Sequence, residues 1–423
     1  MNSPGVDTPD EVLVGARGHE DDDAAEGGPD GDDSAGDPAG RGASWVAPLG
    51  IYGVVLLVLL VVSWRITAGY TEAIPPSAHF AGSWFWDGWV RYDAGWYTII
   101  ATDGYRYQPG HQSPVAFFPL YPLLMRGGGN LIDNTVLAGI LVTIASGAAA
   151  LVAFHRWCAD RLTPSAAVTA VACLAVYPYA YYLYGAVYGD ALFLLCVVLA
   201  FLAFERDQML LAGLAGAAAT GTRLVGVAVI VGLLVGVLER RRAVTRGEGL
   251  RLRVDLGRLR PRDAGVLLSI AGLAAYSGYL WSRFGDPLLF NTVQEAWGQQ
   301  SGWRTWFKYD VYLWLRREPD LFYTHGLLIQ AGLFLLAVLS IPTVARRFGV
   351  RYGAYLAVLV VIPALGSQDF QGMGRYLLGA FPAFAVLGSL VAERATVRRL
   401  ILPVSAVALV VFTGMFANGR YIS

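Results

Sequence analysis

Long stretches without a charged residue constrain this chain more than any other feature of its sequence. They occupy residues 42–64, 134–154, 162–189, 191–204, 264–282, 326–345, 352–368, 376–392 and 400–419. A helix that crosses the hydrocarbon core of a bilayer needs about 20 mostly apolar residues. In lipid, backbone N–H and C=O groups need hydrogen-bond partners within the protein, and a helix supplies them within its own segment. The alternation of apolar and polar residues that is typical of barrel strands is absent. We therefore expect these stretches to be membrane helices.

The composition agrees with a membrane protein. Apolar residues make up 55% of the 423 residues, and charged residues only 15%. A globular chain carries about 25% charged residues, so this chain lacks the polar surface of a soluble enzyme, a fibrous protein or a nucleic-acid binder. Its three cysteines and five histidines show neither a disulfide framework nor metal-ligand spacing, so we expect no metal site and no other cofactor.

Two of the apolar regions contain a break. Pro178 and Gly185 indicate a turn before Asp190, which separates two helices. Loop 239–263 holds nine arginines and should stay cytoplasmic, so we expect 208–238 to be a hairpin of two short helices that turns at residues 220–223. The chain then has about eleven transmembrane helices in a cytoplasmic membrane, with its N-terminus inside and its C-terminus outside.

The N-terminal residues 1–44 differ in kind from the rest of the chain. They hold twelve acidic residues against two arginines, a net charge of −10, among Gly, Pro, Ala and Ser. Such a segment buries too little apolar area to offset its chain entropy, so we expect a disordered cytoplasmic tail. Residues 45–423 then form the membrane domain, with aromatic-rich outward loops at about 65–130 and 283–325.

The first outward loop is where we expect the chemistry, because polar side chains at membrane depth are costly and mark functional sites. It carries two carboxylates, Asp87 and Asp93, among closely spaced aromatic residues. The spacing of Trp89, Tyr92 and Trp96 predicts a short amphipathic helix along the membrane surface. The alternative is an aromatic belt at the membrane interface, with carboxylates that take no part in chemistry.

The same loop contains two motifs that resemble a known family. They are Arg91-Tyr92-Asp93-Ala94-Gly95-Trp96-Tyr97 and Ala116-Phe117-Phe118-Pro119-Leu120-Tyr121-Pro122. Together they resemble the first luminal loop of the PIG-V class of mannosyltransferases, which adds the second mannose of the glycosylphosphatidylinositol anchor in eukaryotes and has bacterial relatives. The class belongs to the GT-C superfamily of membrane glycosyltransferases, which use lipid-phosphate sugars.

Shorter matches extend the resemblance over roughly residues 85–385. They are Pro178 with Tyr188 and Asp190, Thr222-Arg223-Leu224-Val225-Gly226, Asp286-Pro287-Leu288, and Gly374-Arg375-Tyr376-Leu377. The chain departs from the family at three positions. Tyr92 stands where the family has Trp, Tyr177 replaces Asn, and Asp190 replaces Glu.

The resemblance implies a GT-C-like all-α polytopic bundle with short interfacial helices in its first outward loop. It also implies an enzyme that transfers mannose or a related hexose, with inversion, from a polyprenyl-phosphate sugar to a lipid-linked or cell-envelope acceptor. The transfer takes place at the outer face of a bacterial membrane. Because the donor has no nucleotide diphosphate, the reaction does not require a divalent metal. Membrane lipids are the further partners that we expect, and nucleic acid is not.

Transfer from a lipid-phosphate sugar needs a carboxylate that takes the proton of the acceptor hydroxyl. We predict Asp93 as this base, with Asp87 as the second candidate. Other roles stay open at this point. Asp93 could instead cap a short helix or pair with Arg91, and Asp87 could be the N-cap of the surface helix.

The leaving phosphate needs cationic ligands. We predict Arg375 and Arg223 for this role, because each lies at the outer end of a predicted membrane helix. An unpaired guanidinium is costly there, and bidentate contact with phosphate is favourable. The alternatives are ion pairs with Asp190 or Asp369, or side chains that extend to the membrane interface. Lys308 is the only lysine, and we expect it to anchor lipid headgroups. The other residues that we expect to contact substrate are Arg91, Tyr92, Trp96, Tyr97, Asp190, Tyr188, Phe118 and Tyr121.

Two other classes of protein compete with this interpretation. The first is a polytopic transporter or lipid flippase, because Asp190, Arg223 and helices broken at Pro178 and near Thr220 would suit a transport path. The second is a non-catalytic subunit that binds a lipid-linked sugar. No internal repeat is evident, and the polar residues gather in the outward loops, so an enzyme is the preferred hypothesis.

Overall fold

Helices dominate the computed structural model of the chain, which describes residues 44–68, 80, 83–246, 252–299, 302–316, 321–420 and 422. The only strands in these ranges are β1 (Val244–Arg246) and β2 (Leu252–Val254), which form a short antiparallel hairpin. Residues Ala43–Ser423 form one compact unit. The acidic tail lies outside the described residues, so its disorder stays a prediction.

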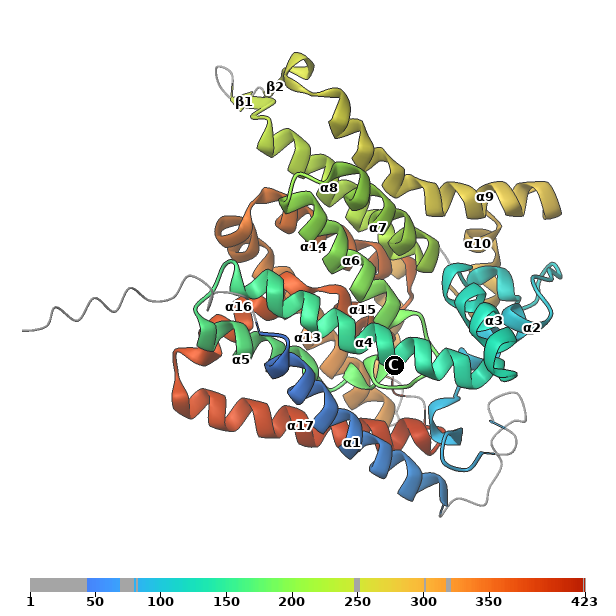
Figure 1. Cartoon of the computed structure of the whole chain (residues 1–423). Helices are drawn as coiled ribbons and strands as arrows, with labels where there is room; N and C mark the ends of the chain where they lie inside the picture. Colours follow the sequence, from blue (N-terminus) through green and yellow to red (C-terminus); the bar gives the residue numbers. More distant parts are fainter. Residues whose placement is uncertain are drawn as a thin grey trace, which may run out of the picture. The chain divides into compact units, whose positions relative to one another are not determined.

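Each of the predicted membrane segments has a helical counterpart (Figure 1). These helices are α1 (Val46–Ala68), α4 (Thr135–Ala159), α5 (Pro164–Ala175), α6 (Asp190–Glu205), α7 (Met209–Thr222), α8 (Val227–Arg240), α9 (Ala271–Phe284), α13 (Leu321–Phe348), α14 (Val350–Gly366), α16 (Phe381–Ala392) and α17 (Ala395–Ala417). A 3-10 helix, Pro261–Ile270, leads into α9.

Five of the described helical segments are long and apolar enough to cross a membrane, and a bent pair makes a sixth. The pair joins α15 (Met373–Tyr376) with its following turn to α16, with a bend of 85°. Large apolar side chains such as Leu57, Leu336 and Val407 are exposed on α1, α13 and α17. Surfaces of this kind face lipid in membrane proteins, so the predicted all-α polytopic fold is confirmed. The number of crossings and their orientation stay predictions.

Both predicted breaks are present. Helix α7 ends at Thr222 and α8 begins at Val227, which confirms the hairpin. A Cβ at Gly226 would lie 2.7 Å from the Ala219 carbonyl oxygen, so this turn requires glycine. The segment between α5 and α6 contains Pro178 and is longer than a simple turn. Its residues 179–189 are buried in the protein, including a 3-10 helix, Ala180–Leu183.

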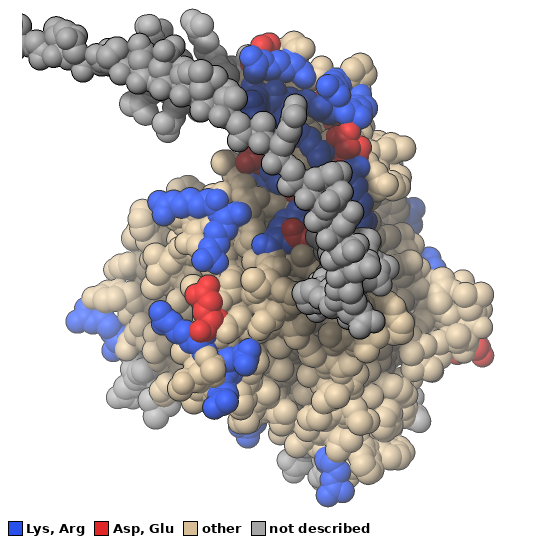
Figure 2. All heavy atoms as spheres, turned by 60° about the vertical axis from the view of Figure 1, so that its left-hand side comes forward, with Lys and Arg blue, Asp and Glu red and all other residues tan. Residues whose placement is uncertain are grey.

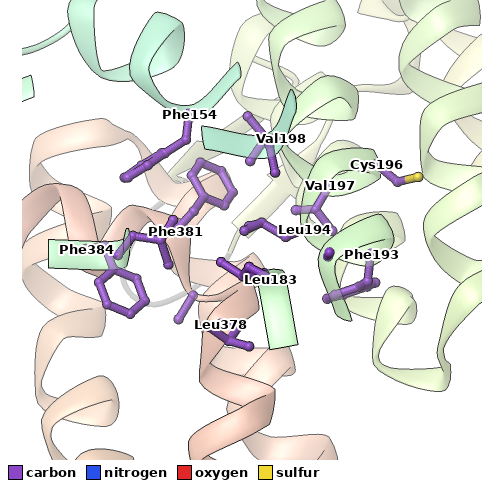
Figure 3. Packing of buried hydrophobic residues seen from close by; sticks show 14 of the residues in the cluster. Phe154, Leu183, Phe193, Leu194, Cys196, Val197, Val198, Leu378, Phe381 and Phe384 are labelled. Carbon is purple, nitrogen blue, oxygen red and sulfur yellow. The ribbon is translucent and has the colours of Figure 1, made fainter. Parts of the chain in front are cut away.

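Packing between α4, α6, α14 and α16 forms the core of the compact unit. Phe381 at the start of α16 contacts the rings of Phe154 on α4, Phe201 on α6 and Tyr355 on α14. Figure 3 shows Phe381 close to Phe154 and to the labelled apolar side chains of α6. Small residues bring the helices close, as is usual where lipid removes the hydrophobic drive for association. At Gly388, for example, an added Cβ would lie 2.4 Å from the Ala170 Cα of α5.

Ion pairs join three helices at the end of the bundle that carries the β-hairpin. Arg351 donates to Glu205 and Glu239, each at 2.7 Å, and thereby links α14 to α6 and α8. Figure 2 shows a cluster of Lys and Arg side chains near the top of the visible face and others along its left side, while most of that face carries no charge. The cytoplasmic position of the loop after α8 stays a prediction.

Two short helices lie between α1 and α4 and carry the predicted chemistry. They are α2 (Ala94–Thr102) and α3 (Leu120–Ile132). Helix α2 begins at Ala94, so the helix predicted from Trp89, Tyr92 and Trp96 is wrong in its extent. Trp89 is fully buried rather than placed on a surface, and Tyr92 interrupts the helical pattern with a φ of 54°.

Candidate active site

The backbone around Asp93 is held in an unusual conformation. Tyr92 has a positive φ, which is costly for a residue with a side chain and often occurs at functional sites. The Tyr188 hydroxyl donates to the Arg91 carbonyl oxygen at 3.1 Å and accepts from the Asp93 N–H at 3.1 Å. Tyr188, from the segment before α6, thus holds the backbone on both sides of Tyr92, and Asp93 is the residue immediately before α2.

The Asp93 carboxylate does not cap its own helix. It accepts a hydrogen bond of 2.8 Å from Nη1 of Arg375, which lies on α15. The two residues are 282 positions apart in the chain. The structure therefore brings the predicted base and one predicted phosphate ligand together, and neither alternative for Asp93 is found.

The Arg375 guanidinium is enclosed by aromatic rings. Its centre lies 5.2 Å from the Tyr188 ring and 5.6 Å from the Tyr182 ring, distances typical of cation–π contacts. Its Nε is buried and has no hydrogen-bond partner among the described residues. The Arg375 guanidinium is thus held by aromatic rings and the Asp93 carboxylate, and its Nε–H could donate a hydrogen bond to a further acceptor.

The second predicted phosphate ligand, Arg223, follows directly after α7. Its Nη1 donates to Asp190, the first residue of α6, so the ion pair considered as an alternative is present. The other Asp190 oxygen, Oδ2, is buried without a hydrogen-bond partner in the described part of the chain. The Tyr376 ring lies 4.8 Å from the Arg223 guanidinium and 5.7 Å from that of Arg375, so both cations meet on this ring.

A cavity of about 450 Å³ joins these groups. Five of the predicted site residues line it, namely Asp93, Tyr97, Phe118, Arg223 and Arg375. Ile362, Pro363 and Leu365 of α14 contribute apolar surface, and Leu224 does so from the turn after α7. The volume lies within the range of small-ligand sites. A second cavity of about 480 Å³ is lined by residues 207–211, 261–262 and 265 and holds none of the predicted site residues.

Asp87 and Arg91 do not line the cavity and form a separate pair. Arg91 is 1% exposed, and its Nη2 donates to Asp87 at 2.8 Å, while its Nε donates to the Ala417 carbonyl oxygen at 3.0 Å. The Asp87 carboxylate also accepts from the Phe80 N–H. This pair ties the first loop to the end of α17, so the structure gives Asp87 a place in the scaffold rather than at the predicted chemistry.

The remaining predicted aromatic residues support the cavity from behind or beside it. Trp96 stacks on Phe117 and meets Trp297 edge to face at 5.9 Å. Tyr121 is fully buried, and its hydroxyl donates to the Gly139 carbonyl oxygen of α4. Tyr97 packs against the Tyr121 ring at 5.1 Å and lines the cavity itself.

The loop after α9 contributes a wall of the cavity. In the sequence, Gln294 and Trp297 of this wall belong to the resemblance that begins at Asp286, but no residue of the wall is among the predicted site residues. Short helices there include α10 (Leu289–Thr292) and the 3-10 helix Val293–Trp297. Asn291, Gln294, Glu295 and Gln299 line the cavity. Glu295 is the only carboxylate between residues 287 and 309, which is the signal that could have pointed to it.

Lys308 does not occupy the predicted headgroup position. Its Nζ donates to the Ala364 carbonyl oxygen at 2.6 Å and to that of Ser367, at the end of α14. The ammonium is therefore directed into the protein. Backbone carbonyls without a partner in the helix attract it more strongly than the surface does.

No group of three or more His, Cys, Asp or Glu side chains that could hold a metal ion is found in the described ranges. Two carboxylates, Asp93 and Glu295, and two guanidiniums, Arg223 and Arg375, line the cavity. Each guanidinium is paired with a carboxylate, Arg375 with Asp93 and Arg223 with Asp190. A metal-independent reaction stays a prediction.

Comparisons with known proteins find similarity in structure. No protein-family model matches the chain, and no curated protein matches its sequence. One similar structure is ArnT from Cupriavidus metallidurans bound to undecaprenyl phosphate, with 14% identity, a TM-score of 0.48, and coverage of 88% of this chain and 76% of that one. Another is the oligosaccharyltransferase AglB from Archaeoglobus fulgidus, in complex with an inhibitory peptide and a dolichol-phosphate. It has 13% identity, a TM-score of 0.40, and coverage of 88% and 56%.

Proposed function

We propose that the protein is a membrane glycosyltransferase of the GT-C type. It transfers mannose or a related hexose from a polyprenyl-phosphate donor to a lipid-linked or cell-envelope acceptor at the outer face of a bacterial cytoplasmic membrane. One observation carries the proposal. A carboxylate, Asp93, and two guanidiniums, Arg375 and Arg223, converge on a single cavity that also has an apolar wall.

The geometry supports a single displacement. The phosphate of the donor binds Arg375 and Arg223, whose planar N–H groups suit its oxygens. Because the phosphate competes for Arg375, it releases the Asp93 carboxylate from its ion pair. Asp93 then takes the proton of the acceptor hydroxyl, and the acceptor oxygen forms a bond to C1 of the sugar. The bond between C1 and the phosphate oxygen breaks, and its electron pair stays on the phosphate, which the arginines stabilise.

The apolar wall gives the prenyl chain a place next to the phosphate ligands. Ile362 and Leu365 of α14 and Leu224 after α7 line the same cavity as Arg223. Leu365 is 48% exposed, so this side of the cavity is accessible from the lipid-facing surface. A donor can then keep its chain in the bilayer while its phosphate and sugar occupy the cavity.

The test is a transfer assay in membranes that contain the full chain, with polyprenyl-phosphomannose as donor. Asp93→Asn is expected to abolish transfer without a change in expression. Asp103→Asn is the matched control, because Asp103 lies in the same loop, is exposed, and pairs only with Arg106 in the structure. Full activity of Asp93→Asn would exclude it as the base. Uptake or lipid translocation by a wild type that transfers no sugar would favour the transporter.

A further inference from the structure

The environment of Lys308 links the second outward loop to the candidate site. Lys308 lies between α11 (Trp303–Trp306) and α12 (Tyr309–Leu315) and has a φ of 53°. This left-handed conformation is costly for a residue with a side chain. It turns the chain so that the ammonium donates to two carbonyl oxygens at the end of α14, those of Ala364 and Ser367.

The end of α14 needs such a donor. The last carbonyls of a helix have no partner within the helix, and a cation there also interacts favourably with the helix dipole. The Ser367 hydroxyl bonds the carbonyl oxygens of Pro363 and Asp369 and tightens the same turn. The Phe370 ring lies 5.5 Å from the ammonium and completes its enclosure.

This turn leads directly to the Arg375 helix. Residues 367–372 connect α14 to α15, and Ser367, Gln371 and Gly372 line the cavity together with Arg375. A second contact from the outward loop reaches the turn from another side, because Gln368 Nε2 donates to the Gly298 carbonyl oxygen. The position of Arg375 relative to Asp93 therefore depends on a turn that Lys308 holds.

We propose that Lys308 is a positioning residue. Its protonated ammonium holds the turn between α14 and α15, and so keeps Arg375 where it binds the donor phosphate. Loss of the proton loosens the turn and weakens phosphate binding. This inference rests on the proposed function, since it assumes that Arg375 is a phosphate ligand.

The charges around Lys308 set the pH at which this occurs. Burial lowers the pKa of the ammonium to about 8, and the carboxylate of Asp369 on the turn opposes the decrease. On the segment that carries Lys308, the charged residues Arg304 and Asp310 form an ion pair with each other. The contacts of Lys308 with α14 are made to backbone carbonyl oxygens. Below pH 8 the ammonium is charged and the turn is held. Phosphate binding should therefore decline as the pH rises through about 8.

Binding of undecaprenyl phosphate to the purified full chain tests the proposal. The second pKa of a phosphate monoester is about 6, so the charge of the ligand is constant above pH 7. Wild-type affinity is expected to fall about tenfold between roughly pH 7 and pH 9.5, the effect of losing one charged hydrogen bond. Lys308→Arg remains charged and should bind with the same affinity at both pH values. Lys308→Met should bind about tenfold more weakly at pH 7.

Arg304→Met is the matched control, because Arg304 is an exposed cation on the same segment that does not contact α14 through its charge. It should keep the wild-type pH profile. Equal affinity of the wild type and Lys308→Met at pH 7, or the same alkaline decline in Lys308→Arg, would overturn the proposal. A wild type that binds undecaprenyl phosphate at no pH would instead overturn the proposed function.

A second readout does not depend on phosphate binding by the variants. Lys308 is the only lysine, so an amine-reactive ester followed by peptide mass spectrometry reports on one side chain besides the N-terminus. Modification should be slow at pH 7.5 and slower still with undecaprenyl phosphate bound. In Arg304→Lys, the exposed new amine should react fast with or without lipid. Fast modification of Lys308 that the lipid does not change would contradict a clamped ammonium.

Discussion

At the scale of single residues, the candidate site depends on contacts between side chains that are far apart in the chain. The sequence predicts Asp93 as the base, with pairing to its neighbour Arg91 or capping of α2 as the alternatives, and the structure shows neither alternative. Instead Asp93 pairs with Arg375. Sequence patterns identified both residues through a resemblance, but no local pattern could predict that they meet, because their contact depends on how the helices pack.

Arg375→Ala should weaken binding of undecaprenyl phosphate by roughly 10- to 100-fold, since a hydrogen bond between charged groups contributes about 1.5–3 kcal/mol. Arg375→Lys should recover part of the loss, because the ammonium keeps the charge but not the bidentate geometry. Isothermal titration with the reconstituted protein measures both. Equal affinity of Arg375→Ala and the wild type would remove Arg375 from the phosphate site.

The Tyr188 hydroxyl bridges Arg91 and Asp93, so its removal should affect the base more than the donor site. Tyr188→Phe keeps the ring beside Arg375 and loses only the hydroxyl. We expect kcat to fall by about tenfold, since the two hydrogen bonds of the hydroxyl with Arg91 and Asp93 are lost, with little change in the KM for the donor. An increase in donor KM at constant kcat would show that Tyr188 acts on the phosphate site instead.

At the scale of helices, the breaks were predictable and the short loop helices were not. The turn between α7 and α8 could be predicted because the basic loop that follows must stay on one side of the membrane. The extent of α2 could not, since the positive φ of Tyr92 interrupts an aromatic spacing that is otherwise helical. Tertiary contacts with Tyr188 stabilise that conformation, and they lie outside any local window.

The crossing of α5 and α16 gives a prediction at this scale. A Cβ at Gly388 would lie within 2.5 Å of Ala170 atoms, so Gly388→Ala should push the two helices apart. We expect a loss of about 1–3 kcal/mol in stability, as for other overpacked sites. Gly278→Ala on α9 is the control, because a Cβ there meets nothing within 4 Å. Thermal unfolding in detergent compares them, and equal melting temperatures would contradict the predicted contact.

At the scale of the whole molecule, the sequence predicted the fold class more completely than the site. Uncharged stretches identify helices without knowledge of their neighbours, and each stretch has its counterpart in the structure. The cavity, by contrast, is built from four separate regions, within residues 93–118, 222–225, 291–299 and 362–376. The sequence predicts no catalytic role for Glu295, which lines the cavity, and no positioning role for Lys308, which lies outside it. The sequence around such residues does not predict their roles, since their contacts with α14 or the cavity depend on how the loops pack in the folded protein.

The predicted orientation can be tested by labelling. The three native cysteines are buried, so new cysteines report their own positions. Asp103→Cys in the first outward loop should react with a membrane-impermeant maleimide in intact cells. Arg258→Cys, in the loop after α8, should react only after permeabilisation. Reversal of this pattern would place the cavity on the cytoplasmic face and contradict the proposed outward chemistry.

The central claim is that Asp93 acts as the base in a cavity where Arg375 and Arg223 bind the donor phosphate. Its most direct test is the single-turnover rate of purified Asp93→Asn at saturating polyprenyl-phosphomannose. Loss of a general base should slow transfer by about 10²- to 10⁴-fold. Undecaprenyl phosphate should bind this variant at least as tightly as the wild type, because Arg375 loses its competing carboxylate. Transfer by Asp93→Asn at the wild-type rate would contradict the account. So would a variant that binds the donor more weakly but transfers sugar at the wild-type rate once the donor is bound.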